Sequence, residues 1–290
     1  MTNLVGSFPV GRLTVSMVSD GALMAPRASW FTGIDPAEWV PVVGVDSPDA
    51  LFPVNFGAFV ITGDGHVTLV DAGLGKLAFS PAMAGMEGAG GMIDRLATLG
   101  IEPGDVDRVV QTHLHGDHCG WLTGVDDDTA LTFPNATVFV QRAEVDYWRS
   151  SAADTNFGPD FTRTRIDAVE QAGLFELLDG GHRLSPEIEI VATPGHTPGH
   201  LSVVIESEHD SAIILGDVAH HCIHLERHGW LQNLDVDPPT SIATRRAIVE
   251  MAIEKQAIVT APHMPILTLV RMERHGEGYR YVPDADLSTA

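Results

Sequence analysis

Thr112-His-Leu-His-Gly-Asp-His-Cys-Gly120 brings three imidazoles and a carboxylate within six consecutive positions. The residues before it, Asp107–Thr112, predict a buried strand because Val109 and Val110 are apolar and β-branched. A rigid strand therefore leads into a loop that is dense in potential metal ligands. Histidine and carboxylate side chains suit zinc, and also manganese, iron or cobalt.

The spacing within this loop indicates two ligand directions. Alternate residues of an extended chain point to the same side, so His113 and His115 can reach one ion. Asp117 and His118 follow the turn at Gly116 and can face a second ion. The alternative is a polar surface loop that holds three histidines by chance. The rest of the chain disfavours that alternative because it supplies the missing ligands.

Three further candidates stand directly after predicted strands. A strand at 188–192 leads into a Pro/Gly-rich turn, which limits the backbone entropy lost when His196 is fixed. A short apolar strand before Asp217 ends in that carboxylate, and another before His263 ends in that histidine. One histidine after a strand is more often structural than a ligand. Three such groups beside a His/Asp cluster indicate a shared site.

Asp71 also follows a predicted strand. Residues 56–62 and 66–70 predict a hairpin joined by Gly63-Asp-Gly65, and Asp71 comes next. A carboxylate at a strand end often orients a metal-bound histidine. It can equally close a turn, and the sequence alone leaves both interpretations open.

Strands and helices alternate along the chain, which is typical of an α/β protein. On the last predicted helix, Ile242, Ala247 and Ile248 belong to the apolar face, whereas Arg245 and Arg246 are expected to face solvent. Helices are predicted at 92–99, 142–150, 161–172 and 240–255, and further strands at 10–20, 133–141 and 175–178.

Residues 21–54 are rich in proline, glycine and aromatic side chains and show no regular period. We therefore expect a long loop there, and such loops are usually functional or disordered. The aromatic content favours a packed loop that walls a pocket, and the other interpretation is plain cover for the core.

Composition limits the class of partner. The 290 residues carry a formal charge of −22, which disfavours nucleic acid and anionic membranes because both require a basic surface. A hydrophobic content of 44% is ordinary for a globular chain, and no apolar run approaches the roughly 18 residues that span a bilayer. No secretory signal is evident, and two cysteines make no disulfide framework. We expect a cytoplasmic protein.

As a set, these residues resemble the metallo-β-lactamase superfamily, whose hallmark is His-x-His-x-Asp-His followed by a distant His, an Asp and a His. The resemblance spans roughly residues 55–265. It implies one domain, 1–290, folded as an αββα four-layer sandwich with two divalent ions, most simply Zn²⁺, at one edge. It also gives Asp71 a supporting role. If the family's ligand positions are transferred to this chain, the first ion is held by His113, His115 and His196. The second is held by Asp117, His118 and His263, and Asp217 bridges both.

Two ions that share a water can lower its pKa from 15.7 to about 7 and supply a bridging hydroxide at neutral pH. Asp117 and Asp217 are placed to hold this water and move its proton. The chain is most similar to the N-acyl homoserine lactonases, which act in quorum quenching, and to the methyl parathion hydrolases. This implies a hydrolase of a small neutral lactone or ester. The alternatives are phosphotriester hydrolysis at the same site, or a mononuclear-iron enzyme similar to persulfide dioxygenases or glyoxalases.

One position departs from this resemblance. The best-known lactonases resemble Asp-x-x-Tyr at the bridging position, whereas this chain has Asp217-Val-Ala-His220. A histidine can also donate a hydrogen bond, so we expect His220 to bind or polarise the substrate. The alternative is a supporting or structural role.

The remaining candidates have simpler interpretations. Cys119 and Cys222 are expected to be buried small hydrophobes, with metal ligation or a regulatory thiol as the alternative. His200 is expected to cap or pack. The tail from Glu273 is polar and offers a contact for a possible homodimer.

Overall fold

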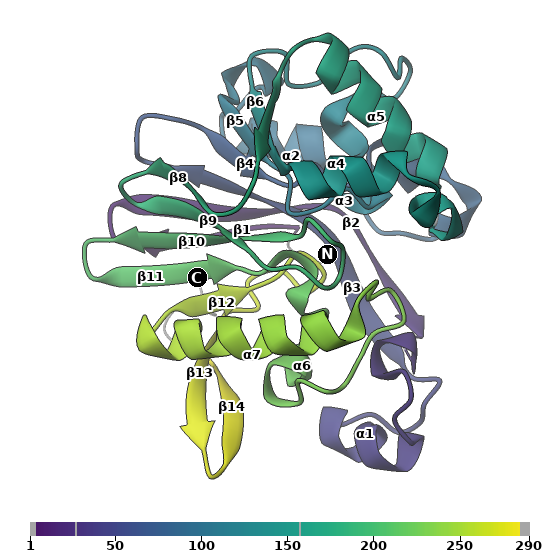
Figure 1. The fold of residues 1–290 in the computed structure, drawn as a ribbon, viewed down its shortest axis with the longest axis vertical. Helices are drawn as coiled ribbons and strands as arrows, with labels where there is room; N and C mark the ends of the chain where they lie inside the picture. Colours follow the sequence, from purple (N-terminus) through teal and green to yellow (C-terminus); the bar gives the residue numbers. More distant parts are fainter. Residues whose placement is uncertain (1–3, 27, 157, 285–290) are drawn as a thin grey trace.

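The computed structural model describes residues 4–26, 28–156 and 158–284. Its strands form two mixed sheets of seven strands each, stacked face to face in the middle of the molecule (Figure 1). The first sheet contains β1 (Val5–Val10), β2 (Leu13–Pro26), β3 (Leu51–Thr62), β4 (Thr68–Val70), β5 (Arg108–Val110), β6 (Thr137–Gln141) and β7 (Phe175–Leu178), in that order. The second contains β14 (Gly278–Pro283), β13 (Val270–His275), β12 (Ile258–Thr260), β11 (Asp210–Ile214), β10 (Leu201–Ser207), β9 (Ile188–Ala192) and β8 (His182–Ser185).

Helices cover the outer face of each sheet. In Figure 1, α4 and α5 lie beyond the first sheet and α7 runs along the second. The helices are α1 (Pro36–Val43), α2 (Met92–Thr98), α3 (Gly116–Cys119), α4 (Arg142–Arg149), α5 (Pro159–Gln171), α6 (Ile223–Glu226) and α7 (Pro238–Glu254). Short 3-10 turns are η1 (Ala28–Phe31), η2 (Gly75–Phe79), η3 (Pro81–Met83), η4 (Pro103–Asp105), η5 (Gly120–Leu122), η6 (Ser151–Thr155) and η7 (Gly216–Val218).

Three apolar interfaces hold these four layers together. The central interface joins the two sheets through inward-facing residues such as Val15, Ile61 and Val203. A second interface packs the first sheet against helices, with Trp148 among its fully buried members, and a third packs the second sheet against α7 through Ile248. The structure confirms the predicted αββα sandwich.

The strands that carry the candidate ligands run parallel in each sheet. In the first sheet β4 pairs in parallel with β5, and in the second β11 pairs in parallel with β12. The carboxyl ends of parallel strands meet at one edge of a sheet, where ligands commonly bind. The residues that follow these four strands are therefore brought together.

The prediction of one long loop over residues 21–54 was wrong in its secondary structure. β2 continues to Pro26 and β3 begins at Leu51, so the two strands pair well beyond a bulge after Ser19. Between them lies the short helix α1, which Asp35 caps by accepting a hydrogen bond from Ala37 N. Because α1 contains Pro41 and buries a single side chain, it shows no amphipathic period.

Most other predicted elements are present within a few residues of their expected ends. The polar tail forms the hairpin β13–β14, and its last residues, 285–290, lie outside the described residues. In the described part of the chain, no helix combines the length and apolar character required to cross a bilayer.

Candidate metal centre

Seven predicted ligands from both sheets converge at this edge. His113 lies three residues beyond β5, His196 four beyond β9, Asp217 three beyond β11 and His263 three beyond β12. The start of α3 supplies the other three, because His115 immediately precedes the helical turn and Gly116 begins the turn that carries Asp117 and His118. The structure thus brings together groups that lie up to 150 residues apart in the chain.

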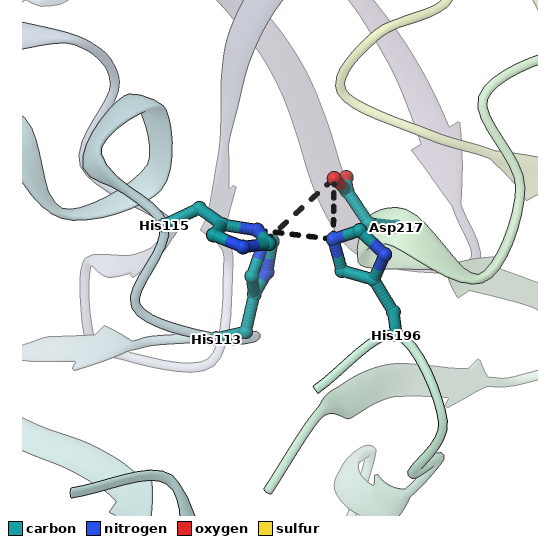
Figure 2. Close-up of side chains that lie close together, drawn as sticks. All are labelled: His113, His115, His196 and Asp217. Atoms are coloured by element: carbon teal, nitrogen blue, oxygen red, sulfur yellow. Dashed lines mark hydrogen bonds and ion pairs between the residues drawn. The ribbon is translucent and has the colours of Figure 1, made fainter. Parts of the chain in front are cut away.

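Four of these side chains form one group. The Nδ1 atom of His115 lies 2.8 Å from His113 Nε2 and 3.0 Å from His196 Nε2. Asp217 Oδ2 lies 3.3 Å from His196 Nε2 and 3.7 Å from His113 Nε2. Figure 2 shows the three rings and the carboxylate pointing at a common centre.

Asp117, His118 and His263 form the second group, and Asp217 faces both. The Nε2 atoms of His118 and His263 are 3.3 Å apart, and His263 Nε2 lies 3.5 Å from an oxygen of Asp117. Asp217 presents Oδ1 to His118 at 3.4 Å and Oδ2 to His263 at 3.3 Å. Its carboxylate therefore stands between the two groups.

The far nitrogens of these rings are also engaged. His118 Nδ1 lies 2.8 Å from Asp71 Oδ2, and the same carboxylate accepts hydrogen bonds from the backbone and hydroxyl of Thr112. His263 Nδ1 lies 2.9 Å from the carbonyl of Asn55. Of the two interpretations of Asp71, the contact with His118 favours orientation of a histidine.

Electrostatics keep most of the cluster in the protonation states that metal binding requires. Burial lowers the pKa of His113 well below its ordinary value and that of His115 to about 3. Burial opposes ionisation of Asp217, but the imidazoles around it, His263 and His118 first, lower its pKa well below the usual range. These rings are therefore neutral and this carboxylate is charged at neutral pH.

The donor set fits two zinc-like cations. Each group supplies histidine nitrogens and carboxylate oxygen, the combination that zinc binds in proteins. Asp217 Oδ1 is buried and has no hydrogen-bond partner among the described residues, although burial of a polar atom ordinarily requires one. The ring nitrogens of each group also converge, so their lone pairs can coordinate a shared cation.

His220 lies beside Asp217, as its sequence position suggests. Its Nε2 is 3.2 Å from Asp217 Oδ2, and its ring stacks on His263 with centroids 4.8 Å apart. Trp30, which belongs to the N-terminal segment of residues 21–54, lies edge-on to this ring, with the two ring centroids 5.6 Å apart. Burial lowers the pKa of His220 to about 4, so the ring is neutral at neutral pH.

A cavity of about 540 Å³ opens onto the cluster. Asp117, Asp217 and His220 line it on the polar side. A smaller space of about 250 Å³ beside it is bounded by two aromatic residues, Trp30 of the segment 21–54 and Phe56 of β3. The apolar wall of the larger cavity contains Leu74, Leu77, Met83, Leu234 and Val236.

Comparison with known proteins places this architecture in a family. The sequence profile described as the metallo-beta-lactamase superfamily matches residues 57–262, which is most of the chain. The chain belongs to the metallo-beta-lactamase superfamily. This range contains six of the seven converging side chains, and the seventh, His263, follows it directly.

Relatives within the superfamily include several lactonases. The chain is 31% identical to the N-acyl homoserine lactonase AttM of Agrobacterium fabrum over 186 residues, covering 60% of this chain and 64% of AttM. The match thus spans less than two thirds of that relative.

Two solved structures share the fold over nearly their whole length. AidC, described as a dizinc quorum-quenching lactonase in complex with a product, has a TM-score of 0.82 at 20% identity, covering 98% of this chain and 99% of AidC. The hydrolase AbOPH has a TM-score of 0.81 at 21% identity, with 98% of each chain covered. At this identity the likeness shows the fold alone.

The structure also contains supporting residues that the sequence did not reveal. Glu144 of α4 is fully buried and accepts hydrogen bonds from Leu114 N at 3.0 Å and Gly199 N at 3.0 Å. It also accepts from the indole of Trp148, whose ring lies edge-on to His115. One carboxylate therefore ties together the two loops that carry His115 and His196 in this superfamily member.

Replacing Glu144 with alanine is expected to destabilise the protein by about 3 kcal/mol, because three buried donors lose their acceptor. Denaturant unfolding of the variant and the parent measures this difference. Asp146→Ala, on the exposed side of the same helix, is the matched control. An equal, small loss in both variants would show that Glu144 does not hold the loops.

His200 and the two cysteines take the structural roles expected of them. His200 Nε2 accepts a hydrogen bond from Asp217 N at 2.9 Å, and its Nδ1 lies 2.9 Å from Thr193 Oγ1. Cys119 and Cys222 are both buried free thiols. Burial raises the pKa of each to about 12, so neither is a thiolate at neutral pH.

Proposed function

We propose that this chain is a dinuclear metal-dependent hydrolase that opens a small neutral lactone or ester. The observation that carries the proposal is the pair of ligand groups joined by Asp217 at the floor of a partly apolar cavity. The similarity to AttM, an N-acyl homoserine lactonase, supports a lactone as the substrate.

Seven side chains would hold the ions. When bound, two divalent ions such as Zn²⁺ lower the pKa of a shared water and polarise a carbonyl oxygen of the substrate. The first ion would be held by His113, His115 and His196, the second by Asp117, His118 and His263, and both by Asp217.

Side chains of the protein then transfer the proton that the attacking water releases. In lactone opening, the water oxygen forms a bond to the carbonyl carbon, and the bond from that carbon to the ring oxygen breaks. The proton released by the water must reach the leaving alkoxide. Asp117 and Asp217 both line the cavity, and we assign this transfer to them.

The cavity walls indicate the chemical character of the substrate's acyl group. Leucine, methionine and valine side chains line the larger cavity, which suits an apolar acyl group. We assign the second wall to the segment 21–54, because its Trp30 lines the same space as Asp117 and His263. A neutral substrate also avoids repulsion by a chain with a net charge of −22.

His220 is proposed to bind or polarise the substrate. Its Nδ1 is buried without a hydrogen-bond partner among the described residues, and its ring lines the cavity. The neutral ring has one N–H, which Nε2 directs to Asp217, so Nδ1 can accept a hydrogen bond from the substrate. His220→Phe is therefore expected to lower kcat/KM by about tenfold, the effect of one lost hydrogen bond. His228→Phe, whose parent ring contacts Leu225 and Tyr279, is the control. An unchanged kcat/KM would remove His220 from the mechanism.

Metal affinity and activity are expected to fall as the pH drops. Burial opposes a positive charge on His118 and His263, but the nearby carboxylates, Asp217 first, outweigh it. They raise the pKa of His118 well above its ordinary value and also raise the pKa of His263. Protons therefore compete with the metal, and zinc affinity should rise about tenfold or more per pH unit. Chelator competition at pH 6, 7 and 8 measures this. Equal affinity at all three, or full activity at pH 5, would contradict it.

The metal-free protein should show the opposite trend. A histidine whose folded pKa is raised contributes stability that is fully present below its unfolded pKa of about 6.5. This contribution is lost as the pH rises through the folded pKa. The increase in Tm on adding zinc should therefore grow with pH, and a differential scanning measurement with and without zinc checks it.

A substrate panel on zinc-loaded protein tests the proposed function. We expect N-acyl homoserine lactones and simple lactones to be opened faster than aryl esters and phosphotriesters. Phosphotriesters as the best substrates would replace the lactone proposal with phosphotriester hydrolysis. One iron per chain, together with oxygen uptake on a persulfide of a small thiol, would replace hydrolysis with a dioxygenase.

A further inference from the structure

Asp235 is a buried carboxylate that no motif in the sequence marks. It lies in the loop between α6 and α7, and its side chain has no exposed surface. Its Oδ1 lies 3.2 Å from His196 Nδ1 and accepts a hydrogen bond from Gln232 Nε2 at 2.9 Å. The opposite nitrogen of the same ring, His196 Nε2, faces Asp217 and His115. Asp235 therefore contacts His196 from the side away from the metal centre.

Arg245 explains how this carboxylate can be buried. An unpaired buried charge is costly, and its cost is offset only by a well-placed partner. Arg245 Nη2 donates to Asp235 Oδ2 at 2.9 Å. The rest of the guanidinium is bound by three backbone carbonyls, those of Val218, His228 and Trp230, at 2.7–3.1 Å. The prediction that Arg245 faces solvent was therefore wrong, because its side chain is fully buried.

Asp235 contacts His196 in the same way that Asp71 contacts His118. In the second ligand group, His118 is backed by the carboxylate of Asp71. In the first group, His196 is backed by Asp235. His113 is instead backed by the hydroxyl of Thr112, a weaker acceptor. Each group thus contains a histidine whose far nitrogen meets a carboxylate.

The loop of Asp235 also forms part of the cavity. Its neighbours Leu234 and Val236 line the apolar wall. Val236 N donates to the carbonyl of His196 at 3.1 Å, and Gln232 Nε2 donates to the carbonyl of Asp217 at 3.1 Å. The same short segment therefore contacts two predicted ligands and the space for the substrate.

We propose that Asp235, held by Arg245, is a positioning residue that fixes His196 with its proton on Nδ1 and its Nε2 lone pair toward the first ion. This inference rests on the metal centre of the proposed function. A hydrogen bond from the ring to a carboxylate fixes the tautomer and increases the basicity of the ligating nitrogen. Loss of such a partner elsewhere weakens metal binding about 10- to 100-fold.

Zinc binding by Asp235→Asn tests the proposal. Competition with a chromophoric chelator gives two dissociation constants for the wild-type protein, and we expect one of them to rise about 10- to 100-fold in this variant. Asp237→Asn is the matched control, because Asp237 lies two residues away and caps α7 through Thr240. Asp71→Asn should raise the other constant. Two unchanged constants in Asp235→Asn would overturn the proposal.

A second measurement uses the wild-type chain, since Asp235→Asn leaves Arg245 unpaired and can fold poorly. Long-range ¹H–¹⁵N correlation spectra at pH 8 report the tautomer of each histidine, and the absence of a signal in His196→Gln assigns His196. We expect a proton on Nδ1 alone. A proton on Nε2, alone or with Nδ1, overturns the proposal. Wild-type protein that binds no zinc would instead refute the proposed function itself.

Discussion

Asp217→Asn is expected to lower kcat/KM by about 10³-fold on the best lactone of the panel. The carboxylate of Asp217 contacts histidines of both ligand groups, with oxygens 3.3–3.4 Å from His196, His118 and His263. An amide at this position is neutral and offers one acceptor oxygen in place of two. The variant therefore loses both charge and the means to bridge two cations.

Steady-state kinetics and zinc content of the same preparation measure the effect. Asp210→Asn is the control, because Asp210 is exposed and lies at the other end of β11. The control should keep its activity and two zinc ions. Wild-type activity in Asp217→Asn would show that this carboxylate neither bridges ions nor moves a proton.

Removal of the metal is expected to abolish hydrolysis and to lower the Tm by at least about 10 °C. Each ion present at 1,000 times its dissociation constant stabilises the folded chain by about 4 kcal/mol. For domains of 150–250 residues, each kcal/mol shifts the Tm by roughly 2–4 °C. The cluster also contains a buried Asp217 oxygen that lacks a hydrogen-bond partner among the described residues, so the apoprotein retains an unsatisfied polar atom.

Calorimetry before and after dialysis against a chelator tests this prediction, with zinc-saturated chelator as the control. Added zinc should restore both activity and Tm. A chelated protein that contains no metal but still hydrolyses the lactone would contradict a metal-dependent mechanism.

The convergence of the strand-end candidate ligands could be predicted from the sequence because each has a local signature. A buried strand with β-branched residues precedes His113, Asp217 and His263, and Gly216 or Pro262 stands directly before the last two. Parallel pairing of β4 with β5 and of β11 with β12 then places them at one edge. Local pattern and sheet geometry together were sufficient for this part of the site.

The supporting carboxylates could not be found in this way. Glu144 and Asp235 act through contacts with residues 30–55 positions away in the chain, and nothing around them in sequence indicates burial. The buried face of α7 includes Arg245 beside Ile248 and Ala252. A prediction based on apolar residues alone assigns Arg245 to the exposed face of this helix. The pairing with Asp235 and the hydrogen bonds to three backbone carbonyls, all created by the fold, make burial of Arg245 favourable.

The N-terminal segment illustrates a different limit. Its aromatic residues indicated a packed wall, and Trp30 and Phe31 are indeed buried. Its secondary structure was missed because α1 is short and contains a proline, and because β2 and β3 extend past a bulge. Tertiary pairing, rather than local periodicity, determines these ends.

The metal content of the active protein tests the central claim most directly. Purified chain, loaded with zinc and freed of excess metal, would be analysed by plasma emission spectroscopy alongside its lactonase rate. Two zinc ions per chain, with a rate that falls as they are withdrawn, are expected from two ligand groups joined by Asp217. Full activity with one ion or none would contradict the dinuclear centre.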